Sequence, residues 1–193
     1  MSTLKNFRPV NDYEKKLIID SISKISSNSE IIFDDSLYEY YSIIKHNKKQ
    51  KNRLQIYLLR QHKAKIKGLN NLHAKIHSIG LYFGFIYRGI FYLSLEGAEF
   101  LYKKGFLSEI KLIYLNKRGE KSVLYGNNIL KSMITKTSAK LQRDDFLLVF
   151  NEFNEILAIA LSKTESNLID KLKPKEIIAL NLKDKGYYLR TPQ

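Results

Sequence analysis

Side chains that commonly do chemistry are few in this sequence and poorly grouped. His73 and His77 are four residues apart and could share one helical face, as zinc-binding histidines do, but no Glu follows His73. Two pairs of adjacent carboxylates, Asp34-Asp35 and Asp144-Asp145, could act as acid and base. Both pairs stand between apolar runs, however, where Asp favours turns. We therefore predict no catalytic residue and no metal site.

Motifs that hold nucleotides or nucleophiles are also missing. The sequence contains no G-x-x-x-x-G-K-[ST] phosphate loop, no G-x-G-x-x-G dinucleotide motif and no G-x-S-x-G nucleophile elbow. It has no cysteine, which excludes disulfide scaffolds, thiolate metal sites and cysteine nucleophiles, and which favours a cytosolic setting. We expect a protein that is not an enzyme and needs no cofactor.

Positive charge is the chemical property in excess. The chain has 33 Lys and Arg against 19 Asp and Glu, a net charge of +14, which indicates a polyanionic partner such as nucleic acid or, less often, an anionic membrane surface. Residues 1–100 and 101–193 share this excess equally. The densest basic run, residues 45–67, has nine basic side chains and no acidic one, and we expect it to extend a nucleic-acid footprint. A solvated loop and helix surface is its alternative. This secondary basic patch comprises Lys48, Lys49, Lys51, Arg53, Lys63, Lys65 and Lys67.

The elements of the first half predict an amino-terminal α/β domain over residues 1–105. Asn11 and Glu14 form a capping-box pattern ahead of a helical apolar face, and Gly105 is a typical helix stop. The apolar stretch from Ile79 to Leu95 is interrupted by Arg88 and falls short of the ~20 residues of a membrane helix, so we predict strands and no membrane span. The opening residues lack the apolar core of a signal peptide. Predicted strands lie at 31–33, 37–44, 54–59, 75–86 and 90–95, and helices at 61–67 and 96–104.

The second half, residues 106–193, predicts a small β-barrel or sandwich of short strands. We expect strands at 110–115, 121–125, 146–151 and 156–162, a short helix at 127–132, and a closing strand pair at 176–182 and 187–190. The predicted fold class is therefore α+β: a mainly antiparallel sheet with flanking helices, followed by a small barrel.

Three strings of the chain resemble one protein family. KSVLYGNNILKSMI at residues 121–134, with the closing GYYLR, resembles the carboxyl-terminal PUA domain of the Nip-seven family of ribosome-biogenesis factors. FRPVNDYEKKLI resembles the family's R-P-[LV]-x-x-x-E opening, and IGLYFGFIYRGIFYLSLEGAEFLYKKG resembles its next segment. The chain departs from the PUA pattern at Met133 and Ala158, where those domains place glycines. The resemblance covers most of the chain.

The resemblance implies a non-enzymatic factor of large ribosomal subunit biogenesis, acting in pre-rRNA processing and assembly. Its PUA domain would bind pre-rRNA or rRNA, in single strands or structured loops, and its amino-terminal domain would bind other ribosome-assembly proteins. The alternative is an accessory subunit or targeting module of an RNA-modification enzyme, since PUA domains accompany such catalysts. The expected location is the cytosol of an archaeon, or the nucleus and nucleolus of a eukaryote.

Candidate RNA contacts in the PUA-like domain are basic or aromatic. Lysines surround Pro174, in a stretch that is similarly basic in archaeal members of the family. Arg190 matches the family's terminal arginine, with a structural ion pair as its alternative. Of the neighbours Tyr187 and Tyr188, one should face outward, where it could stack on a base. For the lysines, a solvated surface is the alternative. The candidate set is Lys131, Lys136, Lys163, Lys171, Lys173, Lys175, Tyr188 and Arg190.

Overall fold

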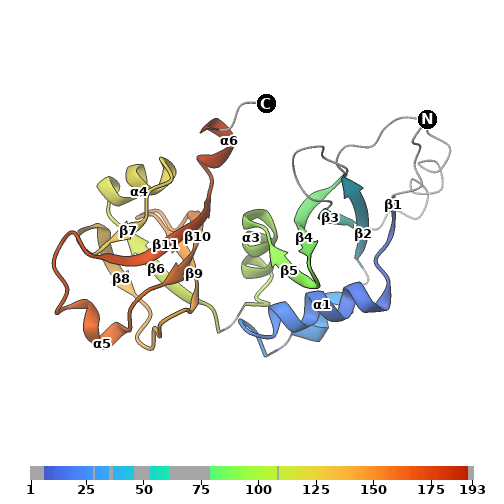
Figure 1. Cartoon of the computed structure of the whole chain (residues 1–193), viewed down its shortest axis with the longest axis horizontal. Helices are drawn as coiled ribbons and strands as arrows, with labels where there is room; N and C mark the ends of the chain where they lie inside the picture. Colours follow the sequence, from blue (N-terminus) through green and yellow to red (C-terminus); the bar gives the residue numbers. More distant parts are fainter. Residues whose placement is uncertain are drawn as a thin grey trace. The chain divides into compact units, whose positions relative to one another are not determined.

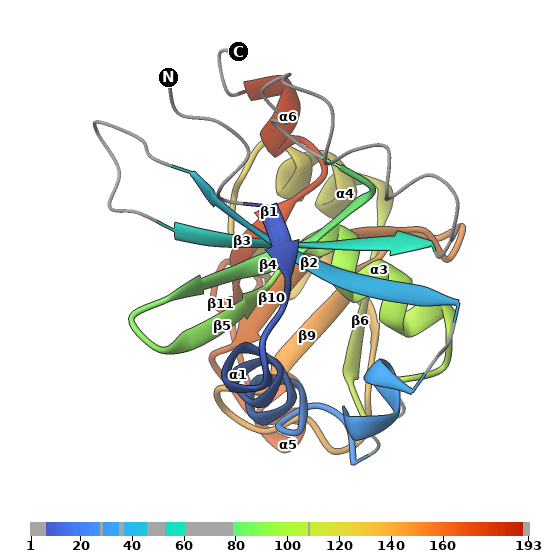
Figure 2. The ribbon, with the colours of Figure 1, turned by 90° about the vertical axis from the view of Figure 1, so that its right-hand side faces the viewer.

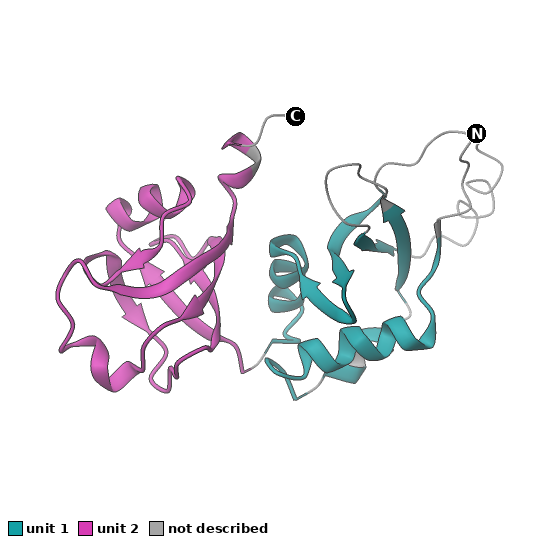
Figure 3. Ribbon diagram, in the orientation of Figure 1, with its two compact units in different colours: residues 1–108 teal, residues 109–193 magenta. Residues whose placement is uncertain are grey.

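The computed structural model divides into two compact units, residues 1–108 (unit 1) and 109–193 (unit 2), shown in Figure 3. It describes residues 7–27, 29–34, 37–45, 53–60, 79–107 and 109–190. The sequence predicted a domain boundary after Gly105, and the structure divides the chain three residues later, after residue 108. Within the described residues, no helix has the length and apolar character needed to cross a membrane.

Unit 1 is built on a five-stranded antiparallel sheet whose strands lie in chain order (Figures 1 and 2). Figure 2 shows the strands fanned by their twist, with β4 and β5 joined as a hairpin. The strands are β1 (Phe7–Pro9), β2 (Tyr38–Lys45), β3 (Arg53–Arg60), β4 (Leu81–Tyr87) and β5 (Ile90–Leu93). The helices within the described residues of unit 1 are α1 (Asp12–Ile22), the 3-10 helix η1 (Ser29–Phe33) and α3 (Leu95–Lys103).

Two predicted helix ends in unit 1 are confirmed, the start of α1 and the end of α3. Asn11 caps α1: its side chain accepts the Glu14 N–H and its own N–H donates to the Glu14 carboxylate, both at 2.9 Å. At the end of α3, Gly105 has a φ of 76° and its N–H donates to the Tyr102 carbonyl, while the Phe106 N–H donates to the Leu101 carbonyl. This is a Schellman motif, which needs a left-handed residue after the helix.

The predicted strand at 31–33 is wrong, because these residues belong to η1. The run is too short to alternate between two faces, and it packs as one turn instead. The Phe33 ring lies 4.6 Å from that of Tyr40, whose hydroxyl donates to the Ile32 carbonyl. The predicted strand at 75–86 begins at Leu81 as β4, and its residues 75–78 lie outside the described ones, as does the predicted helix at 61–67.

Unit 2 is a six-stranded sheet in the order β7-β11-β10-β9-β6-β8. The two end strands, β7 and β8, follow each other in the chain through η2, so the sheet curls toward a barrel (Figure 1). Among the described strands of this sheet, only β6 and β9 pair in parallel. The strands are β6 (Lys111–Leu115), β7 (Ile129–Leu130), β8 (Ile134–Thr137), β9 (Phe146–Phe150), β10 (Ile156–Ser162) and β11 (Ile177–Asp184). The helices are α4 (Lys117–Leu124), η2 (Lys131–Met133), α5 (Ser166–Ile169) and α6 (Tyr187–Arg190).

Three predicted elements of unit 2 are wrong. The expected strand at 121–125 is part of α4, because the Asn116 side chain accepts the Gly119 N–H and starts a helix at residue 117. The expected helix at 127–132 is strand β7 followed by η2. The expected strand at 187–190 is α6, whose Arg190 N–H bonds back to the Gly186 carbonyl. The α+β fold class, with an antiparallel sheet and a small barrel, is confirmed.

Candidate functional site

Three of the candidate lysines lie on one exposed turn between α5 and β11. We call residues 170–176 the lysine loop, after Lys171, Lys173 and Lys175. All three side chains are exposed, and none of them forms an ion pair with a carboxylate of the described residues. The loop is closed by a hydrogen bond of 3.0 Å from the Glu176 N–H to the Lys173 carbonyl. Three unpaired ammonium groups within five residues suit contacts with successive phosphates.

The lysine loop is fixed against η2, which brings a fourth candidate, Lys131, beside it. The backbone N–H of Lys131 donates to the Glu176 carbonyl and that of Ser132 to the Pro174 carbonyl, each at 3.0 Å. The Lys131 ammonium lies 2.9 Å from the Asp170 carboxylate and, by this hydrogen bond, holds the pKa of Asp170 below its ordinary value. Lys131 therefore anchors the start of the loop, and its charge is already paired.

The other two lysines lie in different surroundings. Lys163 is half-buried at the end of β10, and its N–H donates to the Ile178 carbonyl at 2.8 Å, which places it near the start of β11, where the lysine loop ends. Lys136 lies on β8, and its ammonium is 5.6 Å from the centre of the Tyr114 ring on the neighbouring strand β6. The structure thus places the Lys163 backbone beside the end of the loop and the Lys136 ammonium beside Tyr114.

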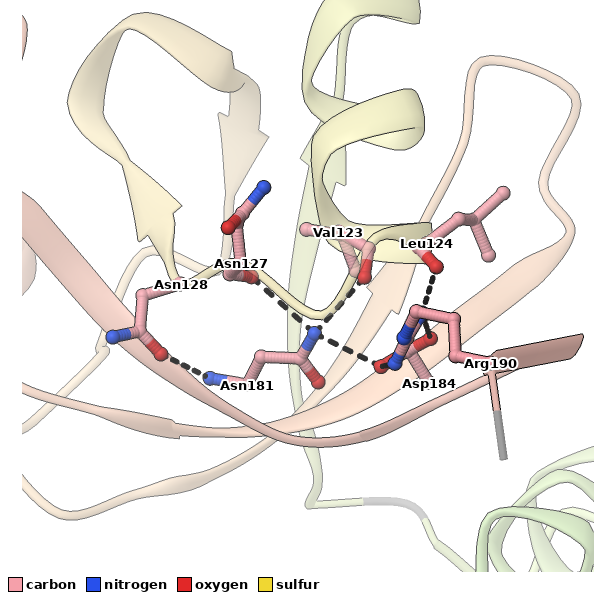
Figure 4. A network of polar contacts seen from close by, with 7 residues as sticks. All are labelled: Val123, Leu124, Asn127, Asn128, Asn181, Asp184 and Arg190. Atoms are coloured by element: carbon pink, nitrogen blue, oxygen red, sulfur yellow. Dashed lines mark hydrogen bonds and ion pairs between the residues drawn. The ribbon is translucent and has the colours of Figure 1, made fainter. Parts of the chain in front are cut away.

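Arg190 forms a structural ion pair, which the sequence analysis gave as the alternative to an RNA contact. Its guanidinium forms two parallel bonds with the Asp184 carboxylate, at 2.9 and 3.0 Å, and also donates to the Leu124 carbonyl (Figure 4). The bonds to Asp184 raise the pKa of Arg190. Gly186 lies so close to Leu124 that any β-carbon there would overlap its carbonyl oxygen. Arg190 therefore attaches α6 to the end of α4.

A neighbouring polar network was not predicted from the sequence. The Asn181 side-chain amide on β11 donates to the carbonyls of Val123 and Asn127, and it lies 3.2 Å from Asp184 (Figure 4). The Asn181 side-chain oxygen is buried without a hydrogen-bond partner in the part of the chain that is described. A single Asn within a strand pattern carries no sign of such a role. Its two carbonyl partners, Val123 and Asn127, are 58 and 54 positions away in the sequence.

The remaining candidates are only partly visible. Tyr188 is in α6, but its side chain lies outside the described residues, whereas the ring of its neighbour Tyr187 lies 4.1 Å from the Lys183 ammonium. Of the secondary basic patch only Arg53 is described, at the exposed start of β3. The others lie outside the described residues: Lys48, Lys49, Lys51, Lys63, Lys65 and Lys67.

The possible acid–base and metal residues do not gather in the described part of the chain. Asp145 accepts the Gln142 N–H at 2.7 Å and Asp144 has a φ of 65°, so this pair serves a turn, as predicted. Among the described residues, no three His, Cys, Asp or Glu side chains are grouped closely enough to hold a metal ion. The histidine pair His73 and His77 lies outside them.

Comparisons with known proteins identify the kind of domain that carries the lysine loop. Residues 111–193 match the family model of the UPF0113 PUA domain. The chain is 27% identical over 187 residues to a UPF0113 protein of Archaeoglobus fulgidus, covering 95% of this chain and 94% of that protein. It is 25% identical over 188 residues to the 60S ribosome subunit biogenesis protein NIP7 homolog of Danio rerio, covering 95% and 97%. The resemblance to the Nip-seven family is confirmed.

Solved structures share the fold over nearly the whole chain. A PUA domain protein of Aeropyrum pernix, in complex with tartrate, has a TM-score of 0.64 at 12% identity and covers 95% of this chain and 88% of its own. A PUA domain protein of Thermoplasma acidophilum has a TM-score of 0.60 at 12% identity, covering 95% and 96%. At this identity the likeness shows the fold.

Proposed function

We propose that this protein, whose residues 111–193 match the UPF0113 PUA domain, binds RNA without catalysing a reaction and acts in large ribosomal subunit biogenesis. The similarity to a protein named for 60S subunit biogenesis runs along 95% of the chain, so it supports a shared role for both units. RNA of the pre-ribosome, in single strands or structured loops, is the proposed ligand of unit 2. We assign the binding of other assembly proteins to unit 1, and the site of action to the cytosol of an archaeon or the nucleolus of a eukaryote.

The observation that carries this proposal is the lysine loop. Its three exposed ammonium groups face solvent on a backbone that is held by hydrogen bonds from the Lys131 and Ser132 N–H groups to the Glu176 and Pro174 carbonyls. A fixed loop loses little conformational freedom when a phosphate backbone binds. Lysine contacts with phosphates give affinity without base specificity. Sequence preference must therefore come from other groups of the protein.

The place of binding is tested by crosslinking the protein to RNA in its own cells and sequencing the attached fragments. We expect a discrete peak on large-subunit rRNA or its precursor. Fragments scattered over all abundant RNA, or concentrated on tRNA, would contradict the role in subunit biogenesis. This measurement is preferred to affinity alone, because a chain with a net charge of +14 binds any RNA at low salt.

The lysine loop itself is tested with a charge-reversed variant. Changing its three lysines to Glu should remove the crosslinking peak. The matched control changes three other exposed lysines of unit 2 to Glu, which alters the net charge equally. If both variants weaken crosslinking to the same extent, overall charge accounts for binding and the lysine loop is not the site. The variant set is Lys171→Glu, Lys173→Glu and Lys175→Glu, and the control set is Lys117→Glu, Lys121→Glu and Lys140→Glu.

A further inference from the structure

Unit 1 carries a continuous series of stacked guanidinium groups and aromatic rings on β3 and the β4–β5 hairpin. The Arg88 guanidinium carbon lies 5.3 Å from the centre of the Tyr87 ring, and that of Arg53 lies 5.8 Å from Tyr87 and 4.7 Å from Phe85. The Phe85 ring stacks on Tyr92 with centroids 5.0 Å apart and planes inclined by only 10°. We call these five side chains the arginine–aromatic ladder.

The ladder lies on the face of the sheet opposite to α3. Phe85 and Tyr92 are register partners, so their side chains share one face. Phe91, next to Tyr92, points to the other face and stacks there on Phe83, with ring centroids 5.6 Å apart. Tyr38 and Tyr40, two residues apart on β2, also face this side: the Tyr40 ring lies 5.1 Å from that of Phe83, and the Tyr38 ring lies 5.1 Å from that of Phe100 on α3. The helix therefore covers Phe83 and Phe91 and leaves the ladder on the other side of the sheet.

Three members of the ladder are accessible. Arg53 and Arg88 are exposed, and 42% of the Tyr92 surface is open to solvent. Ile90, beside them on β5, is 50% exposed. Neither arginine forms an ion pair with a carboxylate of the described residues. This surface therefore combines flat apolar rings with uncompensated positive charge, which matches a ligand that has both planar groups and negative charge.

The charge of the two units favours the same kind of ligand. Residues 1–108 contain 18 Lys and Arg against 9 Asp and Glu, whereas residues 109–193 contain 15 against 10. Unit 1 therefore has a net charge of +9 and unit 2 a net charge of +5. The charge is thus not shared equally between the two units, although it is shared equally between residues 1–100 and 101–193. Unit 1 is thus the more strongly basic of the two, although the PUA domain is in unit 2.

The turn of the hairpin contains an arginine where the backbone favours another residue. Arg88 has a φ of 51° and Gly89 one of 74°, the pair of positive values that a two-residue type I′ turn requires. Asn, Asp and Gly adopt this conformation readily at the first position, and other residues do so rarely. Turn geometry alone therefore does not account for Arg88. Its guanidinium extends the ladder, which a turn-favouring residue could not do.

We propose that the arginine–aromatic ladder is a second RNA-binding surface, which binds single-stranded RNA by stacking bases on Tyr92 and holding phosphates with Arg53 and Arg88. Every base has a planar face, so such a surface accepts any single-stranded sequence and adds affinity through stacking. The proposal goes beyond RNA binding by the PUA domain and uses none of the lysine-loop residues, so either surface can be tested without the other.

The test measures binding of a fluorescein-labelled oligouridylate to the full-length protein across a series of salt concentrations. Tyr92→Ser should weaken binding about 10-fold or more at every salt concentration, because it removes a stacking surface and no charge. Tyr92→Phe keeps the ring and should bind like the original protein. Arg88→Asn should reduce the dependence of log affinity on log salt by about 0.7, the value of one phosphate contact with a single strand.

Arg88→Asn also separates binding from folding. Asn-Gly is a preferred pair in this turn, so the thermal midpoint should stay the same or rise while RNA binding weakens. The matched control is Arg60→Asn, which removes one exposed arginine from the other end of β3. If Tyr92→Ser and Arg88→Asn bind no more weakly than Arg60→Asn, the ladder only stabilises the hairpin and the proposal is overturned.

The lysine-loop variant distinguishes this proposal from the previous one. Weaker binding in the ladder variants alone supports the ladder and contradicts the lysine loop as an RNA site. Weaker binding in the lysine-loop variant alone overturns the ladder. Weakening by both sets, beyond their charge-matched controls, supports two separate surfaces.

Discussion

Glu14 is the side chain whose replacement tests the packing of unit 1 most directly. It is only 5% exposed and has two separate roles: its carboxylate accepts the Asn11 N–H, and it forms two bonds with the Arg8 guanidinium, at 2.5 and 2.9 Å. These bonds raise the pKa of Arg8. Glu14→Gln separates the roles, because Gln also serves in a capping box but has one oxygen and no charge. In the Glu14→Gln variant, the side-chain NH2 group would take the place of one carboxylate oxygen and would face the N–H groups of Arg8, from which it cannot accept a hydrogen bond.

The expected loss is about 2 kcal/mol in the free energy of unfolding. A charge-assisted hydrogen bond contributes about 1.5–3 kcal/mol, and breaking a fully buried ion pair costs about 3–5 kcal/mol. The Arg8 side chain is 44% exposed and can regain water, which favours the lower range. For a domain the size of unit 1 this corresponds to a fall of roughly 8 °C in the thermal midpoint. Scanning calorimetry of the full-length chain would measure it.

Asp12→Asn is the matched control, since it removes a carboxylate from the same helix turn. The Asp12 side chain is fully exposed and lies 3.4 Å from the Lys15 ammonium. An exposed pair of this kind contributes less than about 1 kcal/mol. If Glu14→Gln destabilises unit 1 by no more than Asp12→Asn, the Arg8–Glu14 ion pair does not hold β1 to α1 and the assignment of that role is wrong.

Three further perturbations follow from the same structure. Burial, with a hydrogen bond to Glu39, raises the pKa of Tyr41 to about 12. Because the unfolded chain loses this proton at a lower pH, the free energy of unfolding should fall as the pH rises from about 10 to 12. Tyr41→Phe should make the free energy of unfolding depend less on pH in this range. Gly97→Ala should destabilise unit 1 by about 1–3 kcal/mol in urea unfolding despite the better helix propensity of Ala, because its β-carbon would lie 2.5 Å from the Phe83 carbonyl oxygen. Gly186→Ala should release α6 by overlap with the Leu124 carbonyl, seen as faster amide hydrogen exchange in α6 with the strands of unit 2 still protected.

Elements with strong local patterns could be predicted from the sequence. The capping pair Asn11 and Glu14 defines the start of α1 through residues three apart, and Gly105 ends α3 by a conformation that glycine adopts without strain. The apolar runs of β9 and β10 are buried almost throughout, and such runs are typical of central strands. In each case the information lies within a few residues of the element itself.

The short helices could not be predicted in this way. α4 has eight residues and only two of them, Gly119 and Val123, are fully buried, so the helical period appears only once. α6 depends on Arg190 reaching Leu124, a contact between residues 66 positions apart. A four-residue helix without such a contact has too few internal hydrogen bonds to form. Tertiary contacts therefore decide these segments.

The candidate sites also combine features that the local sequence shows with features that depend on tertiary contacts. The sequence alone marks the lysine loop as basic, but the pairing of Lys131 with Asp170 joins residues 39 positions apart and depends on β7 lying beside β11. Likewise, Arg53 is visible as one charge in a basic run. Its place over Phe85 follows only from the pairing of β3 with β4. The number of basic side chains can be read from the sequence, whereas the group that each of them contacts is known only from the folded structure.

The two departures from the PUA glycine pattern change the core of unit 2 and leave the lysine loop intact. Met133 is 8% exposed and Ala158 is fully buried, so both added side chains point inward. A β-carbon on Gly119 would lie 2.7 Å from that of Met133, so the absence of a side chain at 119 makes the space that Met133 fills. The backbone bonds that hold the lysine loop come from Lys131 and Ser132, immediately before this position. The Met133 side chain is therefore accommodated in the core beside Gly119, and the three lysines of the lysine loop stay exposed.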